Sequence, residues 1–302
     1  MTLRNALIGS LAVVSLAACG TSTPSADSGK IQVVTSTNVW GSVIKAVGGD
    51  AVEVKALLDD PSADPHSYES KPADAALIKD AKLVVFNGGG YDDFFPKLIT
   101  TEGQKKIEAF PLRDDHATPA SGEPAGEHKH EENEHVWYDL HTVRAVAEAA
   151  ANELGALAPD KKTQFESNTA DFSAKLEELE KKVDGIGKGK KVVATEPIAH
   201  YLLDETGAED VTPEAFSKAI EEESDVPAAA LAETNQLVEG KKINVLVDNT
   251  QTENQVTKGI VEKAKSAGIP VVAVTETLPE GVTGYLDWMS KQVDALSQAL
   301  KA

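Results

Sequence analysis

Short apolar, β-branched runs alternate along this chain with segments of helical periodicity, and this alternation constrains the fold more than any other feature. The strand-like runs lie at residues 31–35, 51–58, 83–86, 191–194, 243–247 and 271–274. Helical segments separate most of them, including residues 72–80 and 255–267. Strands that alternate with helices are typical of βαβ units, so the pattern predicts an α/β fold with mostly parallel sheets.

Two consecutive helix signals, at residues 140–157 and 159–183, interrupt this alternation at mid-chain. Apolar residues recur in the second with roughly helical spacing among charged ones: Phe165, Phe172, Leu176 and Leu179. We therefore predict two α/β lobes, at residues 31–140 and 188–302. The connecting helices at 141–187 include a long linker helix that would act as a rigid strut.

The first residues have the form of an export signal. Arg4 is followed by a mainly apolar run at residues 6–18, which is too short for a membrane-spanning helix of about 20 residues. The run ends in Leu-Ala-Ala-Cys, which resembles a bacterial lipobox, and Cys19 is the only cysteine of the chain. We predict a signal peptide at 1–18, a lipid anchor at Cys19 and a flexible tether at 19–30. The alternative is an incidental cysteine near an ordinary cleavage site.

The charge balance excludes several classes of partner. The chain has 49 acidic and 29 basic residues and a formal net charge of −20. Nucleic-acid binding and attraction to anionic lipid both depend on an excess of Lys and Arg, so neither is expected. A single cysteine also excludes an internal disulfide framework and a thiolate zinc cluster within the chain.

The motifs of common enzyme classes are missing or wrongly spaced. The three glycines at residues 88–90 follow a strand but lack the G-x-G-x-x-G spacing, so they predict a tight strand-to-helix turn. His130 and His135 imitate a zincin motif, but five residues apart they would not share a helix face. The chain also has no G-x-S-x-G motif and no P-loop.

A set of histidines and carboxylates lies instead at the boundaries of expected elements: His66, His135, Glu196 and Glu276. Ligands of open α/β sheets bind beyond the carboxyl ends of the strands, where both glutamates stand. Two imidazoles and two carboxylates suit a borderline divalent cation and balance its charge. His200 competes with Glu196, because four residues along a helix both side chains would share a face. Each residue alone is more often a surface, hydrogen-bonded or capping residue.

Five segments resemble the solute-binding lipoproteins of zinc and manganese ABC transporters, the cluster A-I type, and the resemblance covers nearly all of residues 31–300. The matching segments are Ser36-Thr37-Asn38-Val39-Trp40, Asp64-Pro65-His66-Ser67-Tyr68-Glu69, Glu134-His135-Val136-Trp137-Tyr138-Asp139, Ala194-Thr195-Glu196-Pro197 and Thr275-Glu276-Thr277-Leu278-Pro279. The resemblance implies metal ligation by His66, His135 and Glu196. The fourth ligand of the family is usually Asp, and Glu276, which is one methylene longer, stands at that position. The alternative is that a neighbouring carboxylate serves instead.

Residues 114–134 are predicted to form a long acidic loop. It contains three histidines, His116, His128 and His130. Such loops resemble those of zinc-binding family members, where they are thought to gather or sense metal. The alternative is an ordinary solvated loop. The loop favours zinc, whereas glutamate at position 196 favours manganese or mixed use, so the sequence leaves the metal open.

The resemblance implies a receptor without enzymatic activity, lipid-anchored outside the bacterial cell membrane. It would bind Zn²⁺ or Mn²⁺ as a monomer, between its two lobes, and deliver the ion to an ABC permease that works with a separate ATPase. Two alternatives remain at this stage, a secreted zinc-dependent hydrolase and a surface adhesin on the same scaffold.

Overall fold

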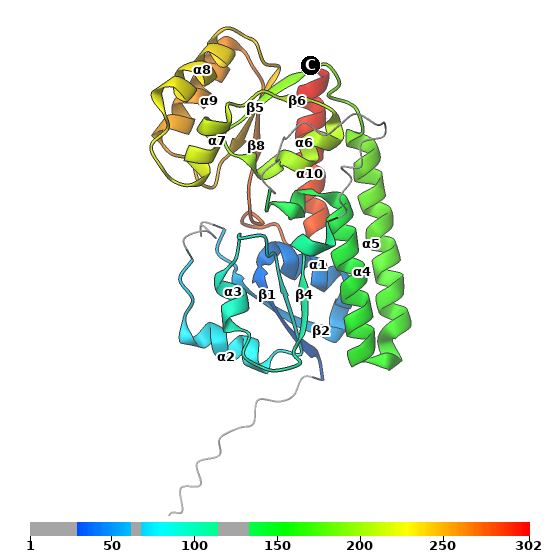
Figure 1. Cartoon of the computed structure of the whole chain (residues 1–302). Helices are drawn as coiled ribbons and strands as arrows, with labels where there is room; N and C mark the ends of the chain where they lie inside the picture. The colour runs from blue at the N-terminus through cyan, green and yellow to red at the C-terminus, as the bar shows by residue number, and fades with distance from the viewer. Residues whose placement is uncertain (1–28, 62–67, 114–132) are drawn as a thin grey trace, which may run out of the picture.

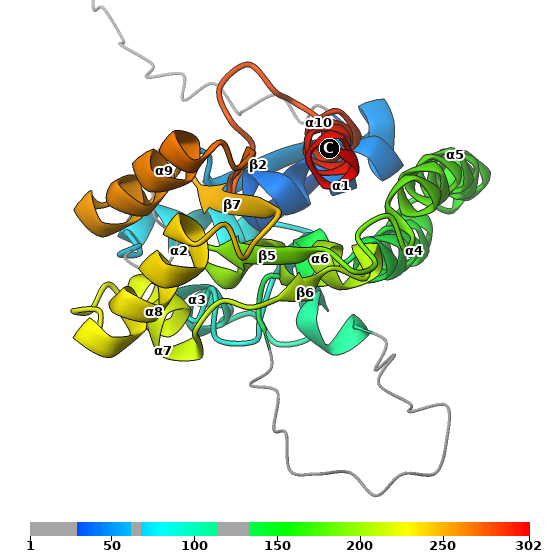
Figure 2. The ribbon, with the colours of Figure 1, turned by 90° about the horizontal axis from the view of Figure 1, so that it is seen from above.

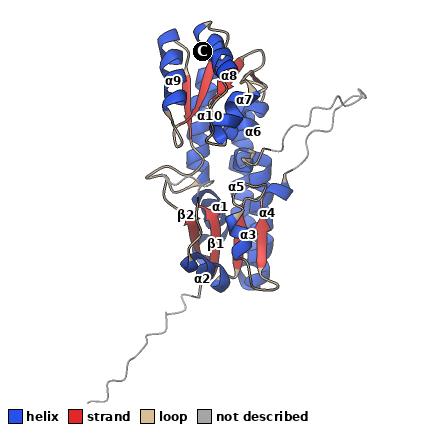
Figure 3. Ribbon diagram, turned by 60° about the vertical axis from the view of Figure 1, so that its left-hand side comes forward, coloured by secondary structure: helices blue, strands red, loops and turns tan. Residues whose placement is uncertain are grey.

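The computed structural model describes residues 29–61, 68–113 and 133–302. The predictions for the signal peptide, Cys19, most of the tether, His66 and the histidines His116, His128 and His130 lie outside the described residues. Within the described part of the chain, no helix is both long enough and apolar enough to cross a membrane. Two four-stranded sheets lie at opposite ends of the molecule (Figures 1 and 3).

The first sheet has the strand order β2-β1-β3-β4, and every pairing in it is parallel. Its strands are β1 (Ile31–Thr37), β2 (Val52–Leu58), β3 (Leu83–Phe86) and β4 (Lys105–Glu108). Its helices are α1 (Asn38–Gly48), α2 (Pro72–Asp80) and the short α3 (Phe94–Leu98). All four residues of β3 are buried, as expected for a strand covered on both faces.

The second sheet has the order β6-β5-β7-β8 and is also fully parallel. Its strands are β5 (Lys191–Ala194), β6 (Glu209–Asp210), β7 (Val245–Asn249) and β8 (Val271–Val274). One face packs on α7 (Glu214–Glu221), α8 (Ala228–Glu239) and α9 (Gln255–Ala267), as Figure 2 shows. The other face lies toward α6 (His200–Thr206) and α10 (Tyr285–Lys301). Val193 and Val192 point to these opposite faces, as neighbours on a strand must.

Two long helices, α4 (Leu140–Leu157) and α5 (Lys162–Val183), connect the sheets. The buried residues of α5 recur every three or four positions: Phe165, Thr169, Phe172, Leu176, Leu179 and Val183. At 22 residues α5 is about 33 Å long, and it packs against α4, α1 and α10. One continuous hydrophobic core includes Val33 and Val85 of the first sheet and Val192 and Val247 of the second. The predicted fold class, two α/β lobes with parallel sheets joined by a long helix, is confirmed.

Five strands and helices were not predicted from the sequence: β4, β6, α3, α7 and α8. In β4 only Ile107 is buried, because Lys105 and Lys106 face solvent on this edge strand. β6 is two exposed acidic residues long and has no apolar signal. The third strand of the second sheet lies at Val245–Asn249, slightly later than the predicted 243–247.

Candidate metal centre

The carboxyl ends of three neighbouring strands bring together the polar residues of the second sheet. Asn249 is the last residue of β7, while Glu196 and Glu276 each follow the last residue of β5 or β8 by two positions. Because the strands are parallel and adjacent, these positions meet at one edge of the sheet. The side chains of all three are buried, so two carboxylates lie where water cannot solvate them freely.

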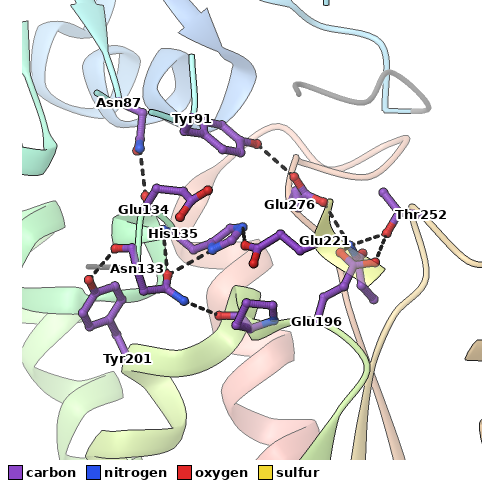
Figure 4. A network of polar contacts seen from close by, with 12 residues as sticks. Asn87, Tyr91, Asn133, Glu134, His135, Glu196, Tyr201, Glu221, Thr252 and Glu276 are labelled. Atoms are coloured by element: carbon purple, nitrogen blue, oxygen red, sulfur yellow. Dashed lines mark hydrogen bonds and ion pairs between the residues drawn. The ribbon is translucent and has the colours of Figure 1, made fainter. Parts of the chain in front are cut away.

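The amide of Asn249 holds the two carboxylates together. Its Nδ2 donates to Oε2 of Glu196 over 2.6 Å and to Oε1 of Glu276 over 2.9 Å. The hydroxyl of Thr252 donates to the other oxygen of Glu196 (Figure 4). Gln251 completes this loop, because its Oε1 accepts from the backbone N–H of Glu276 over 3.1 Å. The last residue of β7 and the residues that follow it therefore fix both predicted carboxylate ligands relative to each other.

His135 lies on the segment before α4 and is fully buried. Oδ1 of Asn133 accepts from the backbone N–H of His135 over 2.9 Å and lies 3.0 Å from its ring Nδ1. The amide orientation of Asn133 is supported because its Nδ2 donates to the carbonyl of Pro197 over 2.9 Å. An acceptor at Nδ1 places the ring hydrogen there, so Nε2 is the basic nitrogen, as a metal-binding histidine requires.

A carboxylate that the sequence analysis missed faces this histidine. Glu221 ends α7, and its Oε1 lies 3.9 Å from Nε2 of His135 (Figure 4). Ligand atoms of Glu134, His135 and Glu221 all lie within 4.8 Å of one another. Burial, and after it the negative charges of Glu134, Glu196 and Glu276, raise the pKa of the Glu221 carboxyl to about 8. In the sequence Glu221 is only the first of three consecutive glutamates, and no motif marks it.

The first lobe reaches the centre through a glycine-rich turn. Residues 88–90 all have positive φ, and they make the tight turn after β3 that the sequence predicted. A Cβ at Gly89 would meet the Phe110 ring at 2.4 Å, so the turn requires glycine there. It places Tyr91 so that its hydroxyl donates to Oε2 of Glu276 over 3.1 Å and its ring lies beside His135. Tyr91 therefore connects the two lobes at the centre.

The segment 133–138 also bridges the lobes. On one side, Nδ2 of Asn87 donates to the Glu134 carbonyl over 2.8 Å. On the other side four hydrogen bonds reach the second lobe and α10, namely Asn133 to Pro197, Tyr201 to Asn133, Tyr138 to Thr275 and Tyr285 to Trp137. Most of the hydrogen bonds named here thus join the segment that holds His135 to the half of the molecule that carries Glu196 and Glu276.

The remaining predicted residues lie elsewhere. His200, the competitor of Glu196, begins α6 with 35% of its side chain exposed, and its Nε2 lies 3.3 Å from the Asp204 carboxylate. His66 falls outside the described residues. Its neighbour Tyr68 is described, and its hydroxyl donates to Asp74 over 2.8 Å. The structure therefore brings Glu196 and Glu276 together and places His135 and Glu221 beside them.

The donor types of this centre fit a divalent cation. Imidazole nitrogen and carboxylate oxygen are ligands that zinc and manganese both accept. Several negative charges converge here from different elements, which a divalent cation would compensate. The class of protein that this architecture defines is a two-lobed binding protein whose polar centre lies where the lobes meet.

Comparison with known proteins identifies the family. The family described as "Zinc-uptake complex component A periplasmic" (ZnuA) matches residues 33–299, and the chain belongs to it. "Zinc-binding lipoprotein AdcA" of Streptococcus pneumoniae strain R6 is 29% identical over 97% of this chain, which spans only 60% of that protein's length. "Iron ABC transporter substrate-binding lipoprotein MtsA" of Streptococcus pyogenes serotype M1 is 28% identical over 96% of both chains.

Solved structures share the fold. The periplasmic zinc binding protein TroA from Treponema pallidum superimposes with a TM-score of 0.72 at 18% identity and covers 91% of this chain and 100% of its own. The Zn(II)-bound ZnuA-like domain of Streptococcus pneumoniae AdcA gives a TM-score of 0.67 at 24% identity with the same coverage. At these identities the likeness establishes the architecture alone.

Proposed function

We propose that this chain is an extracytoplasmic solute-binding lipoprotein that captures Zn²⁺ or Mn²⁺ between its two lobes and delivers the ion to an ABC importer. The observation that carries the proposal is the pair of buried carboxylates, Glu196 and Glu276, held on the Asn249 amide beside the buried His135. Two buried carboxylates within reach of one amide are costly unless a cation joins them. Membership of the ZnuA family supports the same cargo.

In this proposal the ligands are His66, His135, Glu196 and Glu276. The histidines supply neutral nitrogen, and the two carboxylates balance the charge of the ion. His116, His128 and His130 would gather or sense metal. The relatives differ in the metal that their names state, zinc for AdcA, iron for MtsA and manganese for PsaA of Streptococcus anginosus, so the cargo must be measured.

The remaining parts of the proposal concern delivery. Cys19 would carry the lipid that holds the protein at the cell membrane, with residues 19–30 as its tether. Lobes at 31–140 and 188–302, joined through 141–187, would present the loaded ion, as a monomer, to a membrane permease. A separate ATPase would drive uptake. The protein itself would catalyse no reaction.

The test is calorimetric titration of metal-free protein with Zn²⁺ and with Mn²⁺. His135→Ala should weaken binding at least about 100-fold, because it removes a ligand rather than an outer-shell partner, whose loss alone costs about 10–100-fold. His141→Ala is the matched control, since His141 lies on α4 and faces Glu180. His200→Ala should also keep wild-type affinity. Wild-type affinity in His135→Ala would contradict the proposal.

A further inference from the structure

Helix α7 directs one charged side chain inward. Phe216, Ala219 and Ile220 are buried on the second sheet's core, as the apolar face of an amphipathic helix should be. Glu221 continues this face at the last residue of the helix, whereas Glu222 and Glu223 are exposed. The chain therefore buries most of the Glu221 side chain, which is 22% exposed, and leaves the next two glutamates in solvent.

The Glu221 carboxylate lies close enough to His135 for both side chains to bind the same ion. Its Oε1 is 3.9 Å from Nε2, the basic nitrogen of that histidine, too far for a hydrogen bond. Glu134 brings a third ligand atom into the same 4.8 Å cluster. The 3.9 Å between Glu221 Oε1 and His135 Nε2 can be bridged by one cation whose bonds to nitrogen and oxygen are about 2 Å long.

Glu221 differs from the other two carboxylates in its partners. Glu196 and Glu276 accept hydrogen bonds from Asn249, Thr252 and Tyr91. Oε1 of Glu221 is buried, yet it receives no hydrogen bond from any residue that the structure describes. A buried oxygen without a donor is unfavourable. Of the carboxylates around the centre, Glu221 would gain most from a cation.

The negative charges around Glu221 also favour a cation at this position. The carboxylates of Glu134, Glu196 and Glu276 all act on it electrostatically. These residues come from three different places, the bridging segment and the ends of β5 and β8. Their convergence on one helix end creates a negative potential at Glu221 that a divalent cation would relieve.

We propose that Glu221 is a direct ligand of the captured ion and that its oxygen shifts the preference of the centre toward Mn²⁺ relative to Zn²⁺. The inference rests on the proposed metal-binding function. Zinc is satisfied by four ligands in a tetrahedron, whereas manganese favours oxygen donors and an octahedral shell. An additional carboxylate oxygen therefore contributes more to manganese binding than to zinc binding.

Glu221→Gln tests this inference, with Glu222→Gln as the matched control. Both variants remove one carboxylate from adjacent positions, but only the first lies inside. Dissociation constants for both ions are measured by titration of metal-free protein, with a chelator as competitor. We expect Glu221→Gln to weaken Mn²⁺ binding at least about tenfold, since loss of a residue that only orients a ligand already costs about 10–100-fold, and to weaken Zn²⁺ binding less than about threefold. Glu222→Gln should match wild type for both ions.

The outcomes separate the inference from the function on which it rests. If Glu221→Gln equals Glu222→Gln, weakens both ions equally, or tightens binding, Glu221 is not the selective ligand. If the wild-type protein binds neither ion, the proposed function fails as well. Urea unfolding of each metal-free variant checks its fold. A Mn²⁺-loaded crystal of the wild type, with the ion located by anomalous scattering, gives a second readout, and an ion without contact to Glu221 would also overturn the inference.

Discussion

The carboxyl of Asp248 gives the structure a pH dependence that can be worked out in advance. Asp248 stands next to Asn249 in β7, and its side chain is buried beside the hydroxyl of Thr195. Burial, and after it the negative charge of Glu253, raises the pKa of this carboxyl from 3.8 to about 7. The folded protein therefore keeps a proton on Asp248 across a pH range in which the unfolded chain has already lost it.

The sign follows from that difference. Below pH 3.8 both states are protonated, and Asp248 costs no stability. As the pH rises toward 7, only the unfolded state gains from ionisation, so the folded state becomes progressively less stable. A shift from 3.8 to about 7 is about 3 pKa units, which at 1.36 kcal/mol each amounts to about 4 kcal/mol once the pH exceeds 7.

Asp248→Asn removes this cost, because an amide has nearly the shape of the protonated carboxyl and never ionises. Relative to wild type the variant should gain about 2–3 kcal/mol of unfolding free energy between pH 5 and pH 8. The assay is urea unfolding of both metal-free proteins at pH 5, 6, 7 and 8, in which the titrations of groups that do not interact with Asp248 cancel from the difference. Asp287→Asn is the control, since Asp287 is exposed and pairs with Lys291. A difference between Asp248→Asn and wild type that stays constant or shrinks with rising pH would refute the reasoning.

Two further substitutions test the parts that position the centre. Asn249→Leu removes the amide donor shared by Glu196 and Glu276; we expect at least about tenfold weaker Zn²⁺ and Mn²⁺ binding in the titration assay, as for other residues that orient ligands. Unchanged affinity would show that the amide does not set their geometry. Gly89→Ala places a Cβ against the Phe110 ring and fixes an L residue at φ +67°, so it should lower the unfolding free energy by more than about 1 kcal/mol in urea. Gly90→Ala is the control, because a Cβ there meets nothing within 4 Å although φ is also positive. Equal losses of unfolding free energy in the two variants would show that the clash with Phe110 costs no stability.

The sequence predicted the fold well because alternation of strands and helices is a property of the whole chain. Each buried strand of the first and second sheets carries its own apolar run, and α5 carries a clear helical period. β4 and β6 were not predicted because edge strands need few apolar residues. Their polar residues show no hydrophobic alternation that would distinguish these strands from loops.

The site was predictable where a residue follows its own strand directly. Glu196 and Glu276 could be placed at the sheet edge because β5 and β8 are recognisable and parallel strands end together. Glu221 could not be placed, since its position depends on how α7 docks on the second sheet. Asn249 was missed for a different reason. An amide at a strand end has no charge, and its role becomes visible only when two carboxylates from other strands converge on it.

The bridging segment 133–138 determines where the molecule can divide. Chain order assigns His135 to the first half, but its segment makes four hydrogen bonds to residues 197, 201, 275 and 285, and the Asn87 amide bonds to it from the other side. A hinge motion that parts the two sheets beside this segment must break the hydrogen bonds from Asn87 to Glu134 and from Tyr91 to Glu276, and also the two between Asn38 and Leu278. If the molecule opens there, His135 would travel with the glutamates. An ion leaving the centre would lose its contacts with the first lobe first, while the imidazole and both carboxylates keep their mutual distances.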